Sequence, residues 1–336
     1  MNLRKTIIID WLGRTDFFVQ KLANNNVTVL SNKFRTKYRP IRVILKLHYL
    51  ITNIICYLYY VFTRNKTFIF NIPFNIKFDI FLIRMGRKFG NKYVLILHNQ
   101  YIYHEKHVTD VSIYLRNFDK IITHDPSIVN LFPDDNLPIE FRWLPIIGDI
   151  STTNLDNKNI NIDRITTFLF IGNVRPYKGL ELFLRALSLL DPAIKRDVRI
   201  HIAGKHFYEI KYNSFNLLGF NSFEVVDKYL DNEHMQNLIA VSNCIVLPYL
   251  ESSGSAVCSL ALQNNKFILT SDLPVFKLFI NYFGCGDTFV CGDSNSLSEK
   301  ITYLARSPSL LSLNNIRNKS ELSLKDYSKF IESLII

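Results

Sequence analysis

Short apolar runs alternate with amphipathic stretches along the whole chain, and this alternation predicts the elements of the fold. In the second half, each run of apolar residues is followed by a stretch whose apolar positions recur at helical spacing. Strands are predicted at Thr167–Ile171, Val198–Ala203, Ser222–Val226, Asn243–Leu247, Phe267–Thr270 and Thr288–Val290. Helices are predicted at Leu180–Leu190, Glu233–Val241, Ala256–Gln263 and Ser296–Ala305, and a last amphipathic segment spans Leu324–Ile336.

The first half follows the same scheme. Strands are predicted at Thr6–Asp10, Val27–Leu30, Thr67–Asn71, Tyr93–His98 and Lys120–Thr123. Helices are predicted at Thr15–Ala23, Asp79–Phe89 and Val108–Phe118. Because strands that alternate with helices build parallel sheets covered on both faces, the pattern predicts an α/β fold with doubly wound sheets.

A segment without periodicity separates the two halves. Residues 150–163 are rich in Asn, Thr and Asp, which is typical of a linker. We therefore expect an N-terminal Rossmann-like domain at 1–149, a second domain at 164–320 and a C-terminal helix at 321–336. The start of the chain leads straight into a strand and shows no signal-peptide pattern.

Charge changes the picture for the first domain. The 336 residues carry a formal net charge of +11, yet residues 1–120 alone hold 20 Lys and Arg against 6 Asp and Glu. Six cations and no acid lie between Lys33 and Lys46. Such a cluster is either a solvated face or an attractor for nucleic acid or an anionic membrane.

The segment after this cluster favours the membrane. Leu47–Phe62 has no charged residue, and its aliphatic residues fall on one stripe of a helix. The segment is shorter than the about 20 residues that a membrane span needs. A helix of this kind either lies in the headgroup layer or belongs to the domain core, and one exposed edge would satisfy both. We therefore expect an anionic membrane surface, and not nucleic acid, as a partner.

Two loops carry the candidate chemistry. The first, Ile171–Gly179, lies between a strand and a helix and holds two glycines and the cations Arg175 and Lys178. A tight turn at a helix N-terminus, with backbone N–H groups and two cations, suits a diphosphate. A second loop, Leu247–Ala256, again connects a strand to a helix. Since ligands of doubly wound sheets bind at the carboxyl ends of strands, the two loops predict a nucleotide-diphosphate ligand.

The order of these motifs resembles the donor-binding half of the GT-B glycosyltransferases of family 4 (group 1). The resemblance rests on Gly-x-x-Arg-x-x-Lys-Gly from Gly172, the strand end Ala203-Gly204, the acidic helix start at Asp231, Leu-Pro-Tyr-x-Glu-Ser-Ser-Gly-Ser from Leu247, and Ser271-Asp-Leu-Pro274. The strand at Val94–Asn99 is similar to an acceptor-domain strand of that family. The match is clear over about residues 165–305 and weaker over 1–150. It implies a GT-B fold, in which two Rossmann-like domains face a cleft.

The resemblance also implies roles for single residues. Arg175 and Lys178 match the cations that bind the donor diphosphate, and Glu251 matches the first Glu of a Glu-x7-Glu motif, at the donor sugar. The second Glu, which contacts the ribose, falls on Ser259, a weaker neutral partner. The predicted catalytic residues are Glu251 and His98. The predicted donor-binding residues are Gly172, Arg175, Lys178, Ser253, Gly254, Ser255, Ser259 and Gly13.

Two of these residues have a plainer alternative. His98 is either a sugar contact or a structural histidine at a strand end. Gly13 either lets the backbone approach the donor or forms an ordinary turn. No metal is expected, because the family stabilises the departing diphosphate with cations and helix dipoles and the chain has no Asp-x-Asp motif.

The expected protein is a cytoplasmic glycosyltransferase at the inner face of a membrane. It would move a sugar from a UDP- or GDP-sugar to a lipid-linked or saccharide acceptor, in cell-surface polysaccharide or glycolipid synthesis. The resemblance implies retention at the anomeric carbon. Two alternatives stay open: a GT-B nucleotide-sugar epimerase, and a GT-B-like subunit without catalysis.

Overall fold

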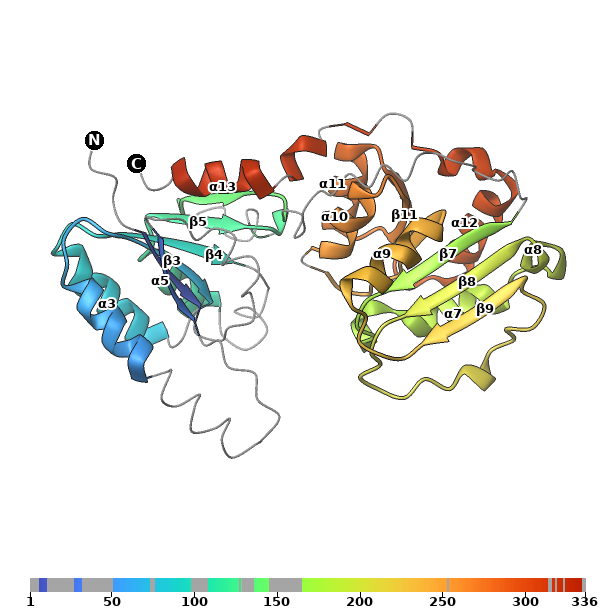
Figure 1. The fold of residues 1–336 in the computed structure, drawn as a ribbon, viewed down its shortest axis with the longest axis horizontal. Helices are drawn as coiled ribbons and strands as arrows, with labels where there is room; N and C mark the ends of the chain where they lie inside the picture. The colour runs from blue at the N-terminus through green and yellow to red at the C-terminus, as the bar shows by residue number, and fades with distance from the viewer. Residues whose placement is uncertain are drawn as a thin grey trace. The chain divides into compact units, whose positions relative to one another are not determined.

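The chain forms two compact units, which we describe separately. The computed structural model describes residues 6–10, 27–31, 51–72, 76–97, 108–126, 128, 136–144, 165–252, 254–313, 316–317, 319–322 and 324–333. The first unit comprises Met1–Trp143 together with Leu324–Ile336, and the second comprises Leu144–Ser323. The last helix thus belongs to the first unit (Figure 1).

The described part of the first unit contains a six-stranded parallel sheet. Its order is β2-β1-β3-β4-β5-β6, and every pair of neighbours is parallel. The strands are β1 (Thr6–Asp10), β2 (Val27–Ser31), β3 (Thr67–Ile72), β4 (Lys92–Leu97), β5 (Lys120–Thr123) and β6 (Ile139–Phe141). The described helices are residues 51–61, α3 (Ile76–Arg87), α5 (Val108–Leu115) and α13 (Leu324–Ser333).

Helix 51–61, α3 and α5 pack on one face of this sheet. Each connects a strand to the next strand in the same direction across the sheet, and right-handed crossovers then place all three helices on the same side. They share one apolar core with the strands. This core includes Tyr57, Val61, Phe68, Phe70, Leu82, Ile83, Tyr93, Tyr114 and Leu115.

Helix 51–61 turns a different face to the core than its aliphatic stripe would indicate. Asn53, Tyr57 and Val61 are buried, whereas Ile51 and Ile55 of the predicted stripe are exposed. The reason is aromatic packing, because the Tyr57 ring lies edge-on to Phe68 and Phe70 of β3 at 5.5 and 5.9 Å. The helix is therefore part of the core and also keeps an exposed apolar side.

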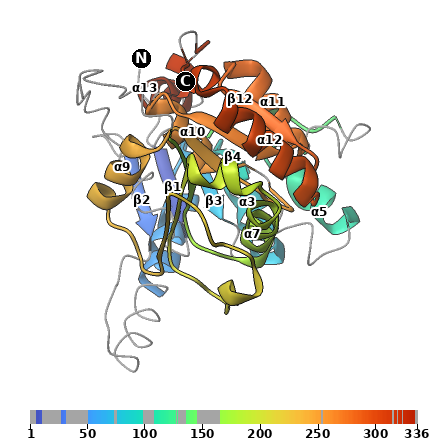
Figure 2. The same ribbon diagram turned by 90° about the vertical axis from the view of Figure 1, so that its right-hand side faces the viewer.

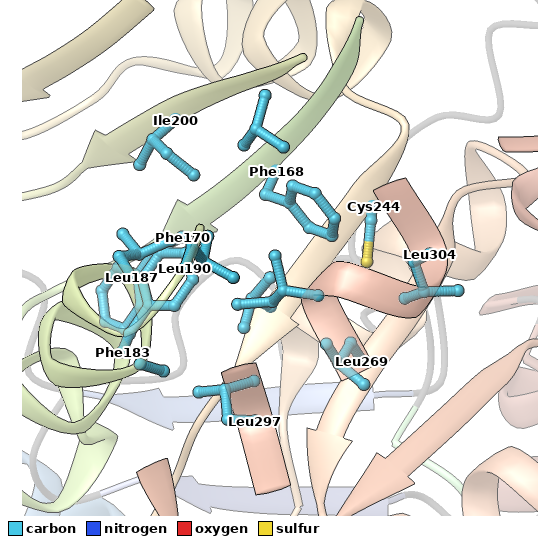
Figure 3. Close-up of a cluster of buried hydrophobic side chains, with 14 of the residues drawn as sticks. Phe168, Phe170, Phe183, Leu187, Leu190, Ile200, Cys244, Leu269, Leu297 and Leu304 are labelled. Carbon is cyan, nitrogen blue, oxygen red and sulfur yellow. The ribbon is translucent and has the colours of Figure 1, made fainter. Parts of the chain in front are cut away.

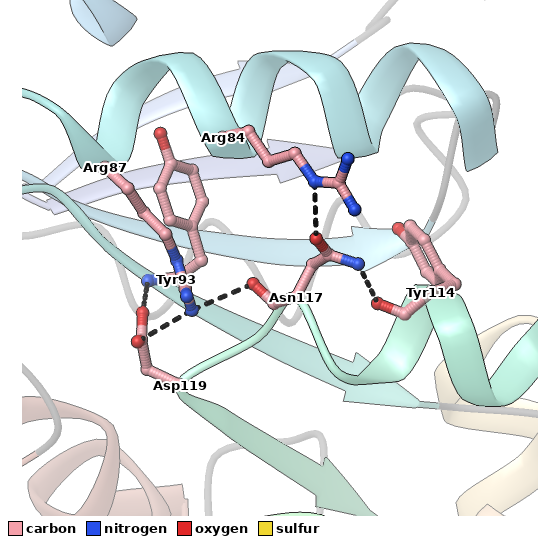
Figure 4. A network of polar contacts seen from close by, with 6 residues as sticks. All are labelled: Arg84, Arg87, Tyr93, Tyr114, Asn117 and Asp119. Carbon is pink, nitrogen blue, oxygen red and sulfur yellow. Dashed lines mark hydrogen bonds and ion pairs between the residues drawn. The ribbon is translucent and has the colours of Figure 1, made fainter.

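A polar network ties the end of α3 to the start of β5 (Figure 4). The Arg87 guanidinium pairs with the Asp119 carboxylate at 2.9 Å and donates to the carbonyl oxygen of Asn117 at 3.1 Å. The same carboxylate accepts a hydrogen bond from the backbone N–H of Tyr93 at 2.7 Å. Arg84 donates to the Asn117 side chain at 3.4 Å. These contacts fix the orientation of α3 on the sheet.

Helix α13 packs beside β5 and β6 of the first unit (Figure 1). The ring of Phe330 lies under the Arg142 guanidinium at 4.1 Å, and Tyr327 is buried against His124. Burial lowers the pKa of His124 to about 4, although its hydrogen bond with the Arg142 carbonyl acts in the opposite direction. The imidazole is therefore neutral at pH 7, and its Nδ1–H donates to that carbonyl at 2.8 Å.

The second unit contains another six-stranded parallel sheet. Its order is β12-β11-β10-β7-β8-β9. The strands are β7 (Thr166–Ile171), β8 (Val198–Ala203), β9 (Ser222–Val226), β10 (Cys244–Leu247), β11 (Phe267–Ser271) and β12 (Gly286–Phe289). The helices are α7 (Leu180–Ser188), α8 (Pro192–Arg196), α9 (Asn232–Val241), α10 (Ala256–Gln263), α11 (Pro274–Phe283) and α12 (Ser294–Arg306).

Two layers of helices cover this sheet. The connection from β7 to β8, which contains α7, runs toward the β9 edge of the sheet. The connections that contain α9, α10 and α11 run toward the β12 edge. Because such crossovers are right-handed, α7 lies on one face of the sheet and α9, α10 and α11 lie on the other (Figures 1 and 2). Helix α12 returns to pack on α7. Figure 3 shows the apolar core on that face, which includes Phe168, Phe170, Phe183, Leu187, Ile200, Cys244, Leu269, Leu297 and Leu304.

Gly179 is the residue on which the start of α7 depends. It ends a short 3-10 helix, η1 (Pro176–Lys178), and precedes the first residue of α7 with a φ of 68°. A Cβ atom at this position would overlap the carbonyl oxygen of Pro248, which follows β10. Both the left-handed conformation and the close approach therefore require glycine.

We expect Gly179→Ala to lower the free energy of unfolding by more than about 2 kcal/mol, because left-handed strain and overlap with rigid backbone add together. Gly219→Ala is the matched control, since Gly219 has a φ of 88° with nothing within 4 Å of an added Cβ. Urea unfolding of both variants measures the difference. Equal losses would show that the contact with Pro248 contributes nothing.

We also expect the first unit to lose stability as the pH falls from about 6.5 towards about 4. His124 stays neutral in the folded state below the pH at which it is protonated in the unfolded chain, so acid favours unfolding. Urea midpoints across this range measure the effect, and His124→Leu should flatten the dependence. An unchanged slope in that variant would contradict the assignment.

Candidate functional site

The order of strands in the second unit places two loops side by side. β7 and β10 are neighbours in the sheet, although they are far apart in the sequence, and the connections leave them in opposite directions. In doubly wound sheets, such a switch point is where ligands bind, outside the carboxyl ends of the strands. The loop after β7 and the loop after β10 both lie at this edge.

The loop after β7 is anchored to the neighbouring strand β8. The N–H of Gly172 donates to the carbonyl oxygen of Ala203 at 2.9 Å. A Cβ atom on Gly204 would overlap the carbonyl oxygen of Gly172, so the two backbones touch. Both predicted glycine features, Gly172 and the Ala203-Gly204 strand end, therefore meet at one point.

The two loops are also bonded to each other. The N–H of Leu250 donates to the carbonyl oxygen of Tyr177 at 2.7 Å. The Tyr249 ring is buried edge-on to Tyr177 at 6.2 Å, and its backbone carbonyl accepts a hydrogen bond from Ser271 Oγ at 2.6 Å. The edge at the switch point is thus a fixed backbone frame.

Lys178 is a half-buried cation inside this frame. Its Nζ lies 5.1 Å from the centre of the Tyr249 ring and 3.3 Å from where a Cβ on Gly172 would stand. Burial lowers the pKa of Lys178, and the nearby Arg175 lowers it further, whereas Tyr177 and Cys258 act in the opposite direction. Lys178 has no carboxylate partner within the described residues. A bound anion would supply the missing counter-charge.

Arg175 stands beside Lys178 at the surface. Its guanidinium stacks over the ring of Phe207 at 4.2 Å. A short parallel bridge between Val174 and His206 holds the backbones next to Arg175 and Phe207 together. The N–H of Phe207 donates to the Val174 carbonyl oxygen at 3.1 Å. Sequence reasoning missed Phe207, whose only signal was an aromatic residue shortly after the Ala203-Gly204 strand end.

The second loop leads into α10, which begins next to Gly172. Val257 Cγ2 lies 3.8 Å from where a Cβ on Gly172 would stand. Ser255 caps the helix, its Oγ accepting a hydrogen bond from the Val257 N–H at 3.2 Å, and Gly254 has a φ of 132°. A helix N-terminus carries a partial positive charge. The structure therefore brings Gly172, Lys178, Gly254 and Ser255 together.

Ser259 and Glu251 have different surroundings. Ser259 is buried within α10, and its hydroxyl donates to the carbonyl oxygen of Leu144 at 3.0 Å, so it anchors the start of the second unit. Its oxygen can still accept a hydrogen bond, and the ribose contact stays a prediction. Glu251 is exposed after β10 and has no ion-pair partner within the described part of the chain.

Three predicted site residues, His98, Ser253 and Gly13, lie outside the described residues. Among the residues that the structure describes, no group of three His, Cys, Asp or Glu could hold a metal ion. Within that same part, no helix is both long and apolar enough to cross a membrane.

Comparisons with known proteins agree with this geometry. A family model described as "Glycosyl transferases group 1" matches residues 152–321, which is half of the chain. A search of curated proteins found no match.

Solved structures share the fold of the whole chain. Anabaena HepE, solved with UDP-glucose, superposes with a TM-score of 0.61 at 12% identity, covering 98% of this chain and 94% of that one. Sucrose-phosphate synthase from Thermosynechococcus elongatus has a TM-score of 0.66 at 12% identity, with 98% of each chain covered. WaaG, a glycosyltransferase involved in lipopolysaccharide biosynthesis, has a TM-score of 0.62 at 10% identity, covering 98% and 99%.

Identities this low establish the fold only. Two parallel α/β sheets and these structural neighbours confirm the predicted GT-B fold. The family model, which matches the unit that holds the two loops, adds the family. The chain belongs to the group 1 glycosyltransferases.

Proposed function

We propose that the chain transfers a sugar from a UDP- or GDP-sugar to a lipid-linked or saccharide acceptor, with retention at the anomeric carbon. UDP is the better supported base, because Anabaena HepE was solved with both UDP and UDP-glucose. A role in cell-surface polysaccharide or glycolipid synthesis is supported by the similarity to WaaG, which is involved in lipopolysaccharide biosynthesis.

The observation that carries the proposal is the position of Lys178. A half-buried cation without a carboxylate partner costs stability unless an anion joins it. It lies at the switch point, beside Arg175 and the N-terminus of α10, and these three positive features suit the two phosphates of a nucleotide diphosphate. The same groups would stabilise the negative charge that develops when the diphosphate departs.

The proposed reaction uses this arrangement. The acceptor hydroxyl oxygen forms the new bond to the anomeric carbon, while the bond from that carbon to the diphosphate oxygen breaks. The acceptor proton passes to the departing phosphate, so atoms and charges balance. In this proposal Glu251, exposed in the loop after β10, contacts the donor sugar. The site needs no metal when Lys178 and Arg175 neutralise the diphosphate.

A second candidate is a GT-B-like subunit without catalysis. It is favoured by Ser259, which stands where the family motif has its second Glu and which already bonds to Leu144. Such a subunit would still bind the nucleotide but would not turn over any sugar nucleotide. A GT-B nucleotide-sugar epimerase would change the donor sugar without an acceptor. Turnover of a panel of sugar nucleotides, with and without saccharide acceptors, separates the three.

Arg175→Ala and Lys178→Ala should each weaken binding of UDP or GDP by about 10- to 150-fold, because a charge-assisted hydrogen bond contributes roughly 1.5–3 kcal/mol. Titration calorimetry of the purified chain measures this. Arg185→Ala is the control, since Arg185 is an exposed cation on the same helix that follows the loop. Wild-type affinity in both site variants would place the diphosphate elsewhere.

Glu251→Gln should fold normally and reduce sugar turnover by at least about 100-fold, if its carboxylate acts at the transition state. Nucleotide-diphosphate affinity should stay close to the wild type, because the inferred partner is the sugar. Glu299→Gln, at an exposed position of α12, is the control. Normal turnover in the Glu251 variant would remove this residue from the mechanism.

A further inference from the structure

Helix 51–61 exposes a row of large apolar side chains opposite its buried side. Asn53, Tyr57 and Val61 face the core. The row consists of Ile51, Ile55, Tyr59 and Phe62, which are 50, 61, 67 and 49% exposed. Positions separated by four, four and three residues lie along one side of a helix, so these four side chains form a continuous strip. We call it the exposed row.

Helix α3 continues this surface. It packs on the same face of the sheet as helix 51–61, and the ends of the two helices meet where Phe62 lies edge-on to Phe89 at 5.7 Å. Phe81 is 56% exposed on the outer side of α3, the side opposite the buried Asp79, Leu82 and Ile83. The two helices thus expose five large apolar side chains on the same face of the sheet.

Cations outnumber acids in the segment that forms this surface. Residues 51–97 contain seven Lys and Arg and a single acid, Asp79, which is buried. Arg64 and Lys88 are exposed and have no ion-pair partner in the described residues. Arg84 points along the outer side of α3 toward Asn117 (Figure 4). The charge of the face is therefore complementary to an anionic surface.

We propose that the exposed row and the outer side of α3 dock on an anionic lipid bilayer. Ile51, Ile55, Tyr59 and Phe62 enter the headgroup layer, and Arg64 and Lys88 contact lipid phosphates. Scattered exposed apolar residues are ordinary, but a continuous strip with a cationic rim is typical of interfacial helices. Tyrosine suits such a position because its ring is apolar and its hydroxyl reaches water.

The two parts of the surface act differently. Cations gather the protein to the anionic surface over a Debye length of about 8–10 Å, and salt weakens this attraction. Apolar side chains hold it there by a contribution that salt does not screen. Under the proposed function, on which this step rests, the docked enzyme would meet a lipid-linked acceptor at the bilayer. Docking itself does not depend on catalysis.

Flotation of the full chain with phosphatidylglycerol and phosphatidylcholine vesicles tests the proposal. The wild type should float with phosphatidylglycerol at low salt, and a smaller fraction should remain bound at high salt. Ile55→Ser with Tyr59→Ser should reduce the partition at high salt by about tenfold or more. Leu189→Ser with Tyr303→Ser is the matched control, because these side chains are 53 and 54% exposed on the second unit. It should float as the wild type does.

Arg64→Glu with Lys88→Glu should reduce the partition at low salt by about 20-fold or more, since each cation near an anionic surface contributes roughly fivefold. Arg196→Glu with Arg306→Glu changes the net charge equally on the second unit and should leave most of the binding intact. UDP and GDP titrations of all variants run in parallel. Unchanged nucleotide binding with lost flotation separates docking from the donor site.

Three results would overturn the proposal. The first is that the wild type floats equally with neutral and anionic vesicles, and the second is that it floats with neither. The third is that the Ile55→Ser, Tyr59→Ser variant and the Arg64→Glu, Lys88→Glu variant both float as the wild type does. A dimer in light scattering that Ile55→Ser with Tyr59→Ser dissociates, without flotation, would assign this face to a second copy of the chain. If any of these results is obtained while UDP or GDP still binds, the proposed donor site stands and the acceptor is reached in solution.

Discussion

The parallel pairing of β7 with β10 is the constraint on which the donor site depends. It brings together two loops that are separated in the sequence by α7, α8, β8, β9 and α9, and it lets Leu250 bond to Tyr177 and Gly179 lie against Pro248. Without that contact, Lys178 would be an ordinary solvated cation at a helix start. With it, the side chain is half-buried over Tyr249, where its charge lacks a protein partner among the described residues. The fold thus places an uncompensated positive charge at this point, where a bound anion would be stabilising.

Much of this arrangement could be predicted from the sequence, because the elements next to the site carry strong local signals. Helix α10 has the bounds that were expected, since Ser255 is a favourable cap and a turn-forming stretch precedes it. β7 is a buried, mostly apolar run, and β8 alternates apolar residues with Arg199 and His201, so both patterns are typical of strands. The alternation of such runs with helices predicts parallel α/β sheets, and the resemblance of the loop motifs to family 4 enzymes adds the GT-B fold.

Other features could not be predicted, for identifiable physical reasons. Helix α11 was not predicted because it has little polar face, so the helical spacing of its apolar residues is hidden; these include Val275, Phe276 and Phe279. The usable signals were Pro274 at its start and Gly284 at its end. β6 is three half-buried residues long and has no apolar run. The orientation of helix 51–61 depends on Tyr57, whose aromatic partners on β3 are visible only in three dimensions. Likewise, nothing in the local pattern indicates that Ser259 bonds to Leu144.

The central claim is that Lys178 and Arg175 hold the diphosphate of the donor at the switch point. A crystal structure of the chain soaked with UDP measures this most directly. The account predicts phosphate density between Gly172 and the N-terminus of α10, with a phosphate oxygen within hydrogen-bonding distance of Lys178 Nζ and of the Arg175 guanidinium. Ordered UDP at any other place, with Lys178 remote from its phosphates, would contradict the account.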